Sequence, residues 1–146
     1  MTRQNRTLLG AAIVLTGVAL QACAASGPYV ELNGHRYSIE IAADNASREH
    51  GLMDRTEMAA DHGMLFVFDD DAMRAFWMKN TKISLDMLFF DGDKKLVSIQ
   101  HNVPPCVADP CAAYSSGAPA RYVLELNAGQ ADLIGVHPGD ELTIRR

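Results

Sequence analysis

The chain has 146 residues, with 13 Lys and Arg against 18 Asp and Glu, and a formal net charge of −5. This length suits one domain with a hydrophobic core. The acidic balance disfavours binding to nucleic-acid backbones and to anionic lipid surfaces, because both carry negative charge.

The N-terminal stretch has the features of an export signal. Arg3 and Arg6 precede an uncharged apolar run over residues 8–20, which is shorter than a membrane-spanning helix needs. Cys23 follows Leu-Gln-Ala at residues 20–22, which resembles the lipobox of bacterial lipoproteins. This resemblance implies cleavage before Cys23, diacylation of its sulfur and a lipid anchor on the periplasmic side of a bacterial membrane. A soluble periplasmic protein and an uncleaved anchor remain the alternatives.

We therefore divide the chain into a signal peptide over residues 1–22, a tether over 23–29 and a domain over 30–146. Removing residues 1–22 takes away two Arg and no acidic residue, which shifts the net charge from −5 to −7. Once Cys23 is assigned to the lipid, Cys106 and Cys111 remain. An even pair in an oxidising compartment predicts a disulfide bond between them.

Two runs of alternating polarity open the domain. Residues 29–32 and 35–41 flank Asn33-Gly34, a pair that favours a two-residue β-hairpin turn because both turn residues need positive φ. Asp44 or Asn45 is then placed to cap a short helix over residues 46–52. Residues 53–62 are polar and mixed, and predict turns.

The middle of the chain is rich in aromatic and apolar residues. Residues 64–68 are continuously apolar, which predicts a strand buried on both faces. The acidic run at residues 69–71 predicts a loop or one helical turn, and residues 76–78 a short extended segment. Residues 83–90 and 96–103 predict a hairpin that turns at Asp91-Gly92.

The last third of the domain begins with an irregular connection. It comprises the disulfide loop and residues 115–120. A strand over 122–126, a short helix within 128–134 capped by Gly135 and a last strand over 141–144 follow. About seven short strands, frequent turns and one or two short helices predict a mainly β, compact single domain of sandwich or barrel type.

Several blocks occur in order along this domain: Arg48 with Gly51-Leu52-Met53 and Arg55; residues 63–68; residues 76–81 with Leu85-Asp86; Cys106 and Cys111; and residues 123–126 with Gly129, Gly139 and Asp140. Together they resemble the bacterial and archaeal family named domain of unknown function 192, over about residues 30 to 144. The resemblance implies a compact, mainly β domain that often follows a signal peptide. It implies no activity, because the family has no settled one.

The segment over residues 76–81 joins large apolar groups to a cation, an amide and a hydroxyl. Such a set suits ligand binding, because a Trp ring stacks on an apolar face while polar groups fix the orientation of the ligand. In the structural alternative, Trp77 belongs to the core and Asp86 pairs with Arg48 or Arg55. The candidate ligand-binding residues are Arg48, Arg55, Trp77, Lys79, Asn80 and Asp86.

The first functional hypothesis is a non-enzymatic cell-envelope module that binds a small molecule, a glycan or a protein partner. The second is a hydrolase-like enzyme in which Asp86 or Asp91 works with Lys79. The third is a structural or assembly lipoprotein without a ligand. We assign no catalytic residue, cofactor or metal, because the methionines fit a core and the histidines lack the spacing of a zinc site.

Overall fold

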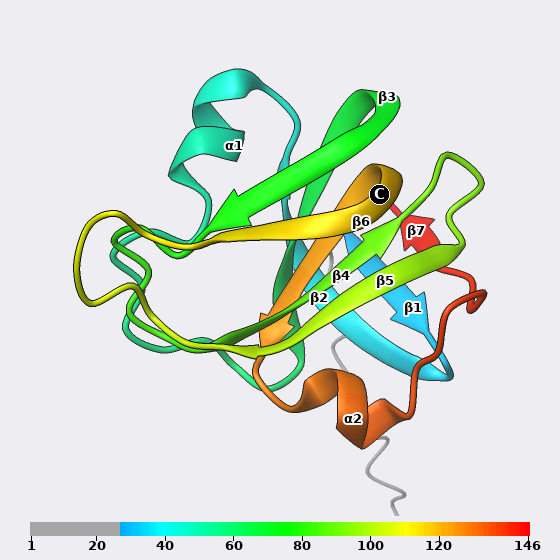
Figure 1. The fold of residues 1–146 in the computed structure, drawn as a ribbon. Helices are drawn as coiled ribbons and strands as arrows, with labels where there is room; N and C mark the ends of the chain where they lie inside the picture. Colours follow the sequence, from blue (N-terminus) through cyan, green and yellow to red (C-terminus); the bar gives the residue numbers. More distant parts are fainter. Residues whose placement is uncertain (1–26) are drawn as a thin grey trace, which may run out of the picture.

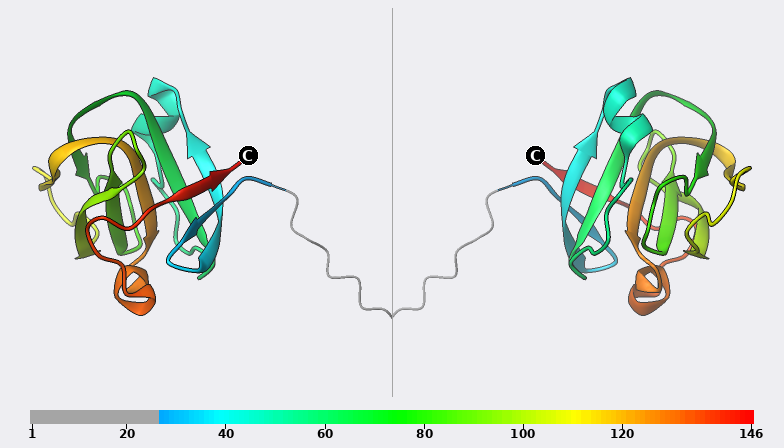
Figure 2. Two further views of the ribbon diagram at one scale, coloured as in Figure 1. Left: turned by 90° about the vertical axis from the view of Figure 1, so that its right-hand side faces the viewer. Right: turned by 90° about the vertical axis from the view of Figure 1, so that its left-hand side faces the viewer.

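The computed structural model describes residues 27–146, so the predicted signal peptide and Cys23 lie outside the described residues. Within this range, seven strands form one sheet in the order β5-β4-β6-β3-β2-β1-β7, accompanied by two short helices (Figure 1). The elements are β1 (Tyr29–Leu32), β2 (His35–Ala42), α1 (Asn45–His50), β3 (His62–Trp77), β4 (Leu85–Phe90), β5 (Leu96–Val103), β6 (Ala113–Asn127), α2 (Gln130–Ile134) and β7 (Thr143–Arg145). The predicted mainly β single domain is confirmed, and its sheet curls into a half-barrel (Figure 2).

The first hairpin forms where the sequence predicts it. β1 and β2 pair around Asn33 and Gly34, which adopt φ values of 49° and 80°. The Asn33 side-chain amide also donates to the carbonyl oxygens of Ile134 at 2.6 Å and Gly135 at 3.1 Å. The turn therefore satisfies carbonyl groups at the C-terminal end of α2 that the helix itself leaves unpaired.

The two edges of the sheet approach each other near the start of β5. The Leu96 N–H donates to the Asp140 carbonyl at 2.8 Å, and the Leu142 N–H donates to the Lys94 carbonyl at 2.9 Å. Between them, the Lys95 ammonium lies 2.7 Å from the Glu141 carboxylate. These contacts join β5 to the segment before β7 and hold the sheet in its curled shape (Figure 2). The last strand begins at Thr143, because Glu141 takes part only in an isolated bridge to Lys95.

The longest strands, β3 and β6, form an antiparallel ribbon that bends between Val67 and Ala72, where the register shifts. Its outer half leaves the sheet and runs toward α1 (Figure 1). The prediction of a loop or helical turn at residues 69–71 is therefore wrong, and so is the irregular connection at residues 115–120. Both segments are strand.

Polar contacts between β3 and β6 explain how such polar segments become strands. The Arg121 guanidinium lies 2.9 Å from the Asp71 carboxylate across the ribbon. The buried Ser116 hydroxyl accepts from the Arg74 N–H at 2.9 Å and donates to the Ala118 carbonyl at 2.6 Å. The ion pair links the two strands, and the Ser116 hydroxyl satisfies backbone groups where the ladder is irregular, as expected at β-bulges.

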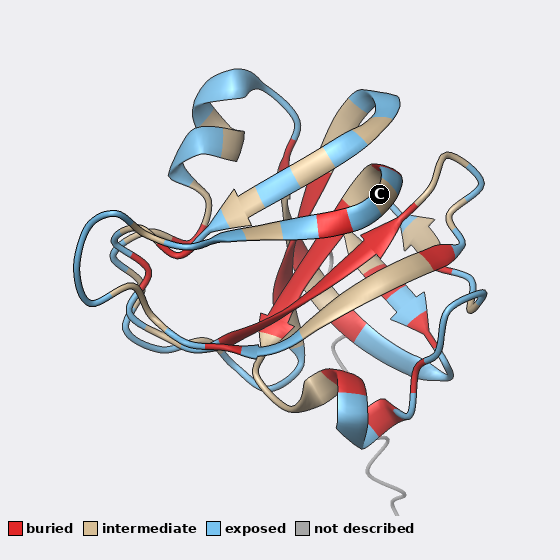
Figure 3. Cartoon of the chain, in the orientation of Figure 1, coloured by how far each residue is buried: buried red, intermediate tan, exposed pale blue. Residues whose placement is uncertain are grey.

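The sheet buries a separate core on each face. Neighbouring residues of one strand belong to opposite cores, as with Leu65 and Phe66, or Leu88 and Phe89. Every residue of β4 is buried, so this strand lies between the two cores (Figure 3). α2 packs on the core that contains Leu65 and Leu88. The segment after α1 covers the other core, which we call the methionine face because Met64, Met78 and Met87 belong to it.

Candidate ligand-binding site

A cavity of about 350 Å³ opens on the methionine face, between α1 and the ribbon of β3 and β6. We call it the α1 cavity. Its volume lies within the range of sites that hold small molecules. It is lined by Asn45, Arg48, Glu49, His50, Gly51, Leu52, Met53, Phe66, Phe68, Ala75, Phe76, Trp77, Lys79, Thr81 and Glu125.

Aromatic rings form one wall of the α1 cavity. Phe76 meets Phe66 edge-to-face at 5.0 Å between centroids and Phe68 at 6.4 Å. Phe66 lies before the bend of β3, Phe68 lies within it and Phe76 lies after it. The fold of the ribbon back toward α1 therefore assembles a wall that a straight strand would spread apart.

Trp77 and Lys79 lie at the mouth of this cavity. Trp77 is 49% exposed, and the Lys79 ammonium lies 5.4 Å from the centre of its ring, a cation–π distance. Both residues also line an adjacent groove that includes Asn80. The Asn80 side-chain amide lies 3.9 Å from the Met53 sulfur, and the Asn80 carbonyl accepts from the Asp54 N–H at 2.8 Å. Three of the six candidate residues thus gather at one rim.

Arg48 joins them from α1, but as an anchor of the helix. Its guanidinium donates to the carbonyl oxygens of Ala43 at 2.6 Å and Val67 at 2.8 Å. It also donates to the Asn45 side chain at 2.6 Å and lies 5.1 Å from the centre of the Phe68 ring. The contacts with Val67 and Phe68 fasten α1 to β3. Those with Ala43 and Asn45 order the start of the helix, and together these contacts fix the opposite wall of the cavity.

Arg55 does not line the α1 cavity. Its guanidinium pairs with the Glu40 carboxylate at 2.7 Å, and the His62 ring nitrogen lies 2.9 Å from the same oxygen. Partial burial works to raise the pKa of Glu40, but hydrogen bonds from His62 and Arg55 outweigh it and hold this pKa below its usual value. The structural alternative, in which Asp86 pairs with Arg48 or Arg55, is therefore wrong on this point, because both Arg side chains have other partners.

Asp86 is fully buried on the opposite face of β4 from the cavity. One carboxylate oxygen accepts from the Asn102 N–H at 2.8 Å and the other from the Ala131 N–H at 2.8 Å. Gly129, at the N-terminus of α2, offers no side-chain cap. Asp86 supplies that acceptor from β4, and its negative charge suits a helix N-terminus.

Glu125 is the residue of the cavity that sequence reasoning missed as a candidate. It lies on β6 between Met64 of β3 and Met87 of β4, and it is 4% exposed. Within residues 27–146, its carboxyl group forms no hydrogen bond or ion pair. Burial raises its pKa to about 8. A sequence signal existed, because an acidic residue interrupts the apolar strand Val-Leu-Glu-Leu at residues 123–126.

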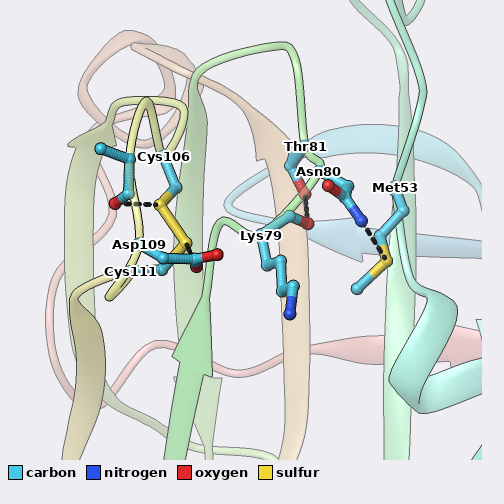
Figure 4. The surroundings of a disulfide bond; sticks show 8 residues. Met53, Lys79, Asn80, Thr81, Cys106, Asp109 and Cys111 are labelled. Atoms are coloured by element: carbon cyan, nitrogen blue, oxygen red, sulfur yellow. Dashed lines mark hydrogen bonds between the residues drawn. A yellow bond between two sulfur atoms is a disulfide. The ribbon is translucent and has the colours of Figure 1, made fainter.

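The predicted disulfide between Cys106 and Cys111 is present, with an S–S distance of 2.05 Å. Figure 4 shows it beside the segment that carries Lys79 and Thr81, and the Cys106 N–H donates to the Met78 carbonyl at 3.4 Å. Asp109 lies close to both sulfurs, but the disulfide leaves no thiolate for a metal. The loop therefore supports the rim of the α1 cavity.

Comparison with known proteins places this architecture in a family. Residues 29–144 match the model of the DUF192 family, which is described as "Uncharacterized ACR". A Sinorhizobium meliloti protein described as a candidate transcription regulator has a similar structure, with 43% identity and a TM-score of 0.74, and the match covers 80% of this chain and 92% of that one. A protein of unknown function from Novosphingobium aromaticivorans is 34% identical with a TM-score of 0.73, and the match covers 79% and 83% of the two chains. No curated protein matches.

Proposed function

This chain belongs to the DUF192 family, and we propose that it is a ligand-binding protein whose ligand enters the α1 cavity. One observation carries the proposal. The cavity combines aromatic walls with a single buried carboxyl group, Glu125, that has no partner within residues 27–146. A mostly apolar hollow with a few convergent polar groups is the usual form of a small-molecule site.

The energetics of Glu125 favour this function over a purely structural role. Burial raises the pKa of Glu125 from 4.5 to about 8, so ionising this carboxyl group in the folded protein costs stability. The neighbours Met64 and Met87 show that an apolar residue suits the position well. A costly group that the fold does not need is best explained by a contact that forms only with a ligand.

The proposal is tested by screening a small-molecule library by ligand-observed NMR against the domain of residues 27–146. We expect hits whose signals are weakened by Trp77→Ala and by Glu125→Gln. Met73→Ala is the matched control, because Met73 is 59% exposed on the same strand and does not line the cavity. Hits that bind both cavity variants as tightly as the unmodified protein would place the site elsewhere.

A second candidate function is acid–base catalysis, because a carboxyl group with a raised pKa in a cavity is typical of a general acid. Here Glu125 takes the role that the sequence suggested for Asp86, since Asp86 does not line the α1 cavity. Chromogenic ester, phosphoester and glycoside substrates test it. Turnover that Glu125→Gln abolishes would establish an enzyme, and turnover that it leaves unchanged would dismiss Glu125 as the acid.

We also propose that the domain is tethered to the periplasmic side of a bacterial membrane through a diacylated Cys23. The lipobox-like residues 20–22 and the disulfide in the domain support this location, because disulfides persist in oxidising compartments. In residues 27–146, no helix is long and apolar enough to cross a membrane. Mass analysis of the mature N-terminus tests the anchor, and an unmodified terminus at Ala24 or Ala25 would refute it.

The description of the Sinorhizobium meliloti protein suggests a regulatory role. For this chain, regulation through direct binding to DNA is disfavoured. The net charge of −5 repels the phosphate backbone, which dominates the affinity of most DNA-binding proteins. We therefore propose no nucleic-acid partner.

A further inference from the structure

We propose that the ligand of the α1 cavity is an organic cation, a protonated amine on an apolar or aromatic body, whose ammonium group pairs with Glu125. This inference rests on the proposed binding function and adds the chemical class of the ligand. It follows from the charge of the cavity floor, from the nature of the walls and from the size of the hollow.

When Glu125 is ionised, its carboxylate requires a hydrogen-bond donor or a positive charge. Glu125 lies between the methionines of β3 and β4, where no described side chain donates to it. The nearest fixed cation on α1, Arg48, is already committed to two backbone carbonyls and the Asn45 side chain. An ammonium group brought by the ligand supplies a partner for the ionised carboxylate, and a charge-assisted bond at this buried position is stronger than one in water.

The walls are suited to the rest of such a ligand. Phe66, Phe68 and Phe76 present aromatic surface, which contacts an apolar body and attracts a cation placed over a ring face. Two rings beside the cavity already do so within the protein: Arg48 lies over Phe68 and Lys79 over Trp77. A volume of about 350 Å³ accepts an amine with a single ring.

The other charged groups around the cavity do not reverse this preference. Arg48, Glu49 and His50 come from α1, and Lys79 follows β3, so they lie on the walls and at the mouth. From β3 and β4, the residues paired with Glu125 are Met64 and Met87, which carry no charge. Glu125 is thus the one charged or titratable group that the sheet itself contributes to the described lining.

Binding of an amine must displace a proton. In the empty cavity, burial holds the pKa of Glu125 at about 8, so the carboxyl group is mostly protonated at neutral pH. A cation binds the ionised form, so its affinity increases roughly tenfold from pH 6 to pH 7 and levels off above pH 8. A neutral ligand that uses the protonated acid shows no such increase.

The test uses three probes of similar shape and different charge: 2-phenylethylamine, 2-phenylethanol and 3-phenylpropionate. Isothermal titration calorimetry of the domain at pH 6, 7, 8 and 9 measures affinity and, in buffers of different ionisation enthalpy, proton release. We expect the amine to bind at least tenfold more tightly than the alcohol at pH 8, with release of close to one proton at pH 6 to 7. The anionic probe should not bind.

Variants assign the effect to one carboxyl group. Glu125→Gln keeps the size of the side chain and removes its ionisation, so we expect loss of the amine preference, of the pH dependence and of proton release. Met73→Ala, at an exposed position of β3 that does not line the cavity, should change none of these. Proton release by the unmodified protein tests the inference even where the variant folds poorly.

The outcomes separate the two proposals. Equal or tighter binding of the alcohol or the anion, or amine binding without proton release, overturns the cationic ligand while the binding function stands. Failure of all three probes, together with a screen in which no hit responds to Trp77→Ala, overturns both.

Discussion

The two faces of the sheet each bury one carboxyl group, and the two groups differ in how many hydrogen-bond partners they have. Asp86 and Glu125 lie on neighbouring strands, β4 and β6, and both are almost inaccessible to solvent. The Asp86 carboxylate accepts two hydrogen bonds from backbone N–H groups, one at each of its oxygens. Glu125 has no such partner among the described residues and lines a cavity.

This contrast shows that two almost equally buried carboxyl groups can differ completely in their partners, so burial alone is a poor guide to the role of an acid. A carboxylate that satisfies backbone donors is part of the fold, because its charge and its hydrogen bonds are complete. A buried carboxyl group that lines a cavity and has no partner in the described residues destabilises the fold when it ionises, because burial disfavours its charged form. The number of partners, and not the residue type or its depth, distinguishes the two.

The largest effect should come from removing the satisfied carboxylate. Asp86→Ala leaves the N–H groups of Asn102 and Ala131 unpaired and removes the cap of α2. Each hydrogen bond to a charged group contributes about 1.5 to 3 kcal/mol, so we expect a loss of about 3 to 5 kcal/mol in the free energy of unfolding. Urea denaturation measures it. A loss below about 1 kcal/mol would contradict the structural role assigned to Asp86.

On the other face of the sheet, removing the acid should increase the free energy of unfolding. The pKa of Glu125 is raised from 4.5 to about 8 by burial, so the folded state holds a proton that the unfolded state releases between these values. Stability from this group is therefore fully present below about pH 4.5 and is lost as the pH rises toward 8. Glu125→Gln has no ionisation to lose. We expect it to exceed the unmodified protein in stability by about 2 to 4 kcal/mol at pH 8 and to match it closely at pH 4.5.

Urea denaturation at pH 4.5, 6, 7 and 8 measures this difference. Asp86→Asn is the matched control, because the same acid-to-amide change on the other face should destabilise the protein at every pH. A Glu125→Gln variant whose stability parallels that of the unmodified protein across this range would show that the carboxyl group has a partner in solution.

Removing the disulfide tests whether the loop of residues 106–111 contributes to binding at the α1 cavity. Cys106 and Cys111 are five positions apart, and closing so short a loop contributes about 2 kcal/mol on the chain-entropy model. Cys106→Ser with Cys111→Ser should therefore lower the free energy of unfolding by about 2 kcal/mol. It should also weaken binding at the α1 cavity, because the loop contacts the Met78 carbonyl beside Lys79. A double variant that loses stability and keeps full affinity for a ligand would make the loop a staple only.

The sequence predicted the elements well where pattern and partner are local. Asn33-Gly34 defined the first hairpin, and an acidic cap at Asp44 defined the start of α1. It failed at residues 69–71 and 115–120, where strand pairing is held by contacts between segments far apart in the sequence, such as Asp71 with Arg121. Alternation and turn propensity carry no information about such pairs.

The candidate site was predicted in part for the same reason. Trp77, Lys79 and Asn80 lie within four positions of the sequence, so they could be grouped from the sequence alone, and they line one groove at the rim of the cavity. Asp86 was grouped with them by its neighbourhood in the sequence, but alternation along β4 turns it to the opposite face. Glu125 follows Trp77 by 48 positions in the sequence. It lines the same cavity only because β6 pairs with β3.

The smallest and most discriminating effect concerns the two candidate arginines. Arg48→Ala removes three hydrogen bonds, of which the one to the Val67 carbonyl ties α1 to β3, so we expect a loss of about 1 to 2 kcal/mol in the free energy of unfolding and a marked loss of ligand affinity. Arg55→Ala removes a partly exposed ion pair with Glu40, which contributes about 0.2 to 1 kcal/mol and lies outside the cavity. Ligand affinity of Arg55→Ala should therefore equal that of the unmodified protein. Equal losses of affinity in both variants would mean that the binding surface extends from α1 to β2 and that Arg55 belongs to the site.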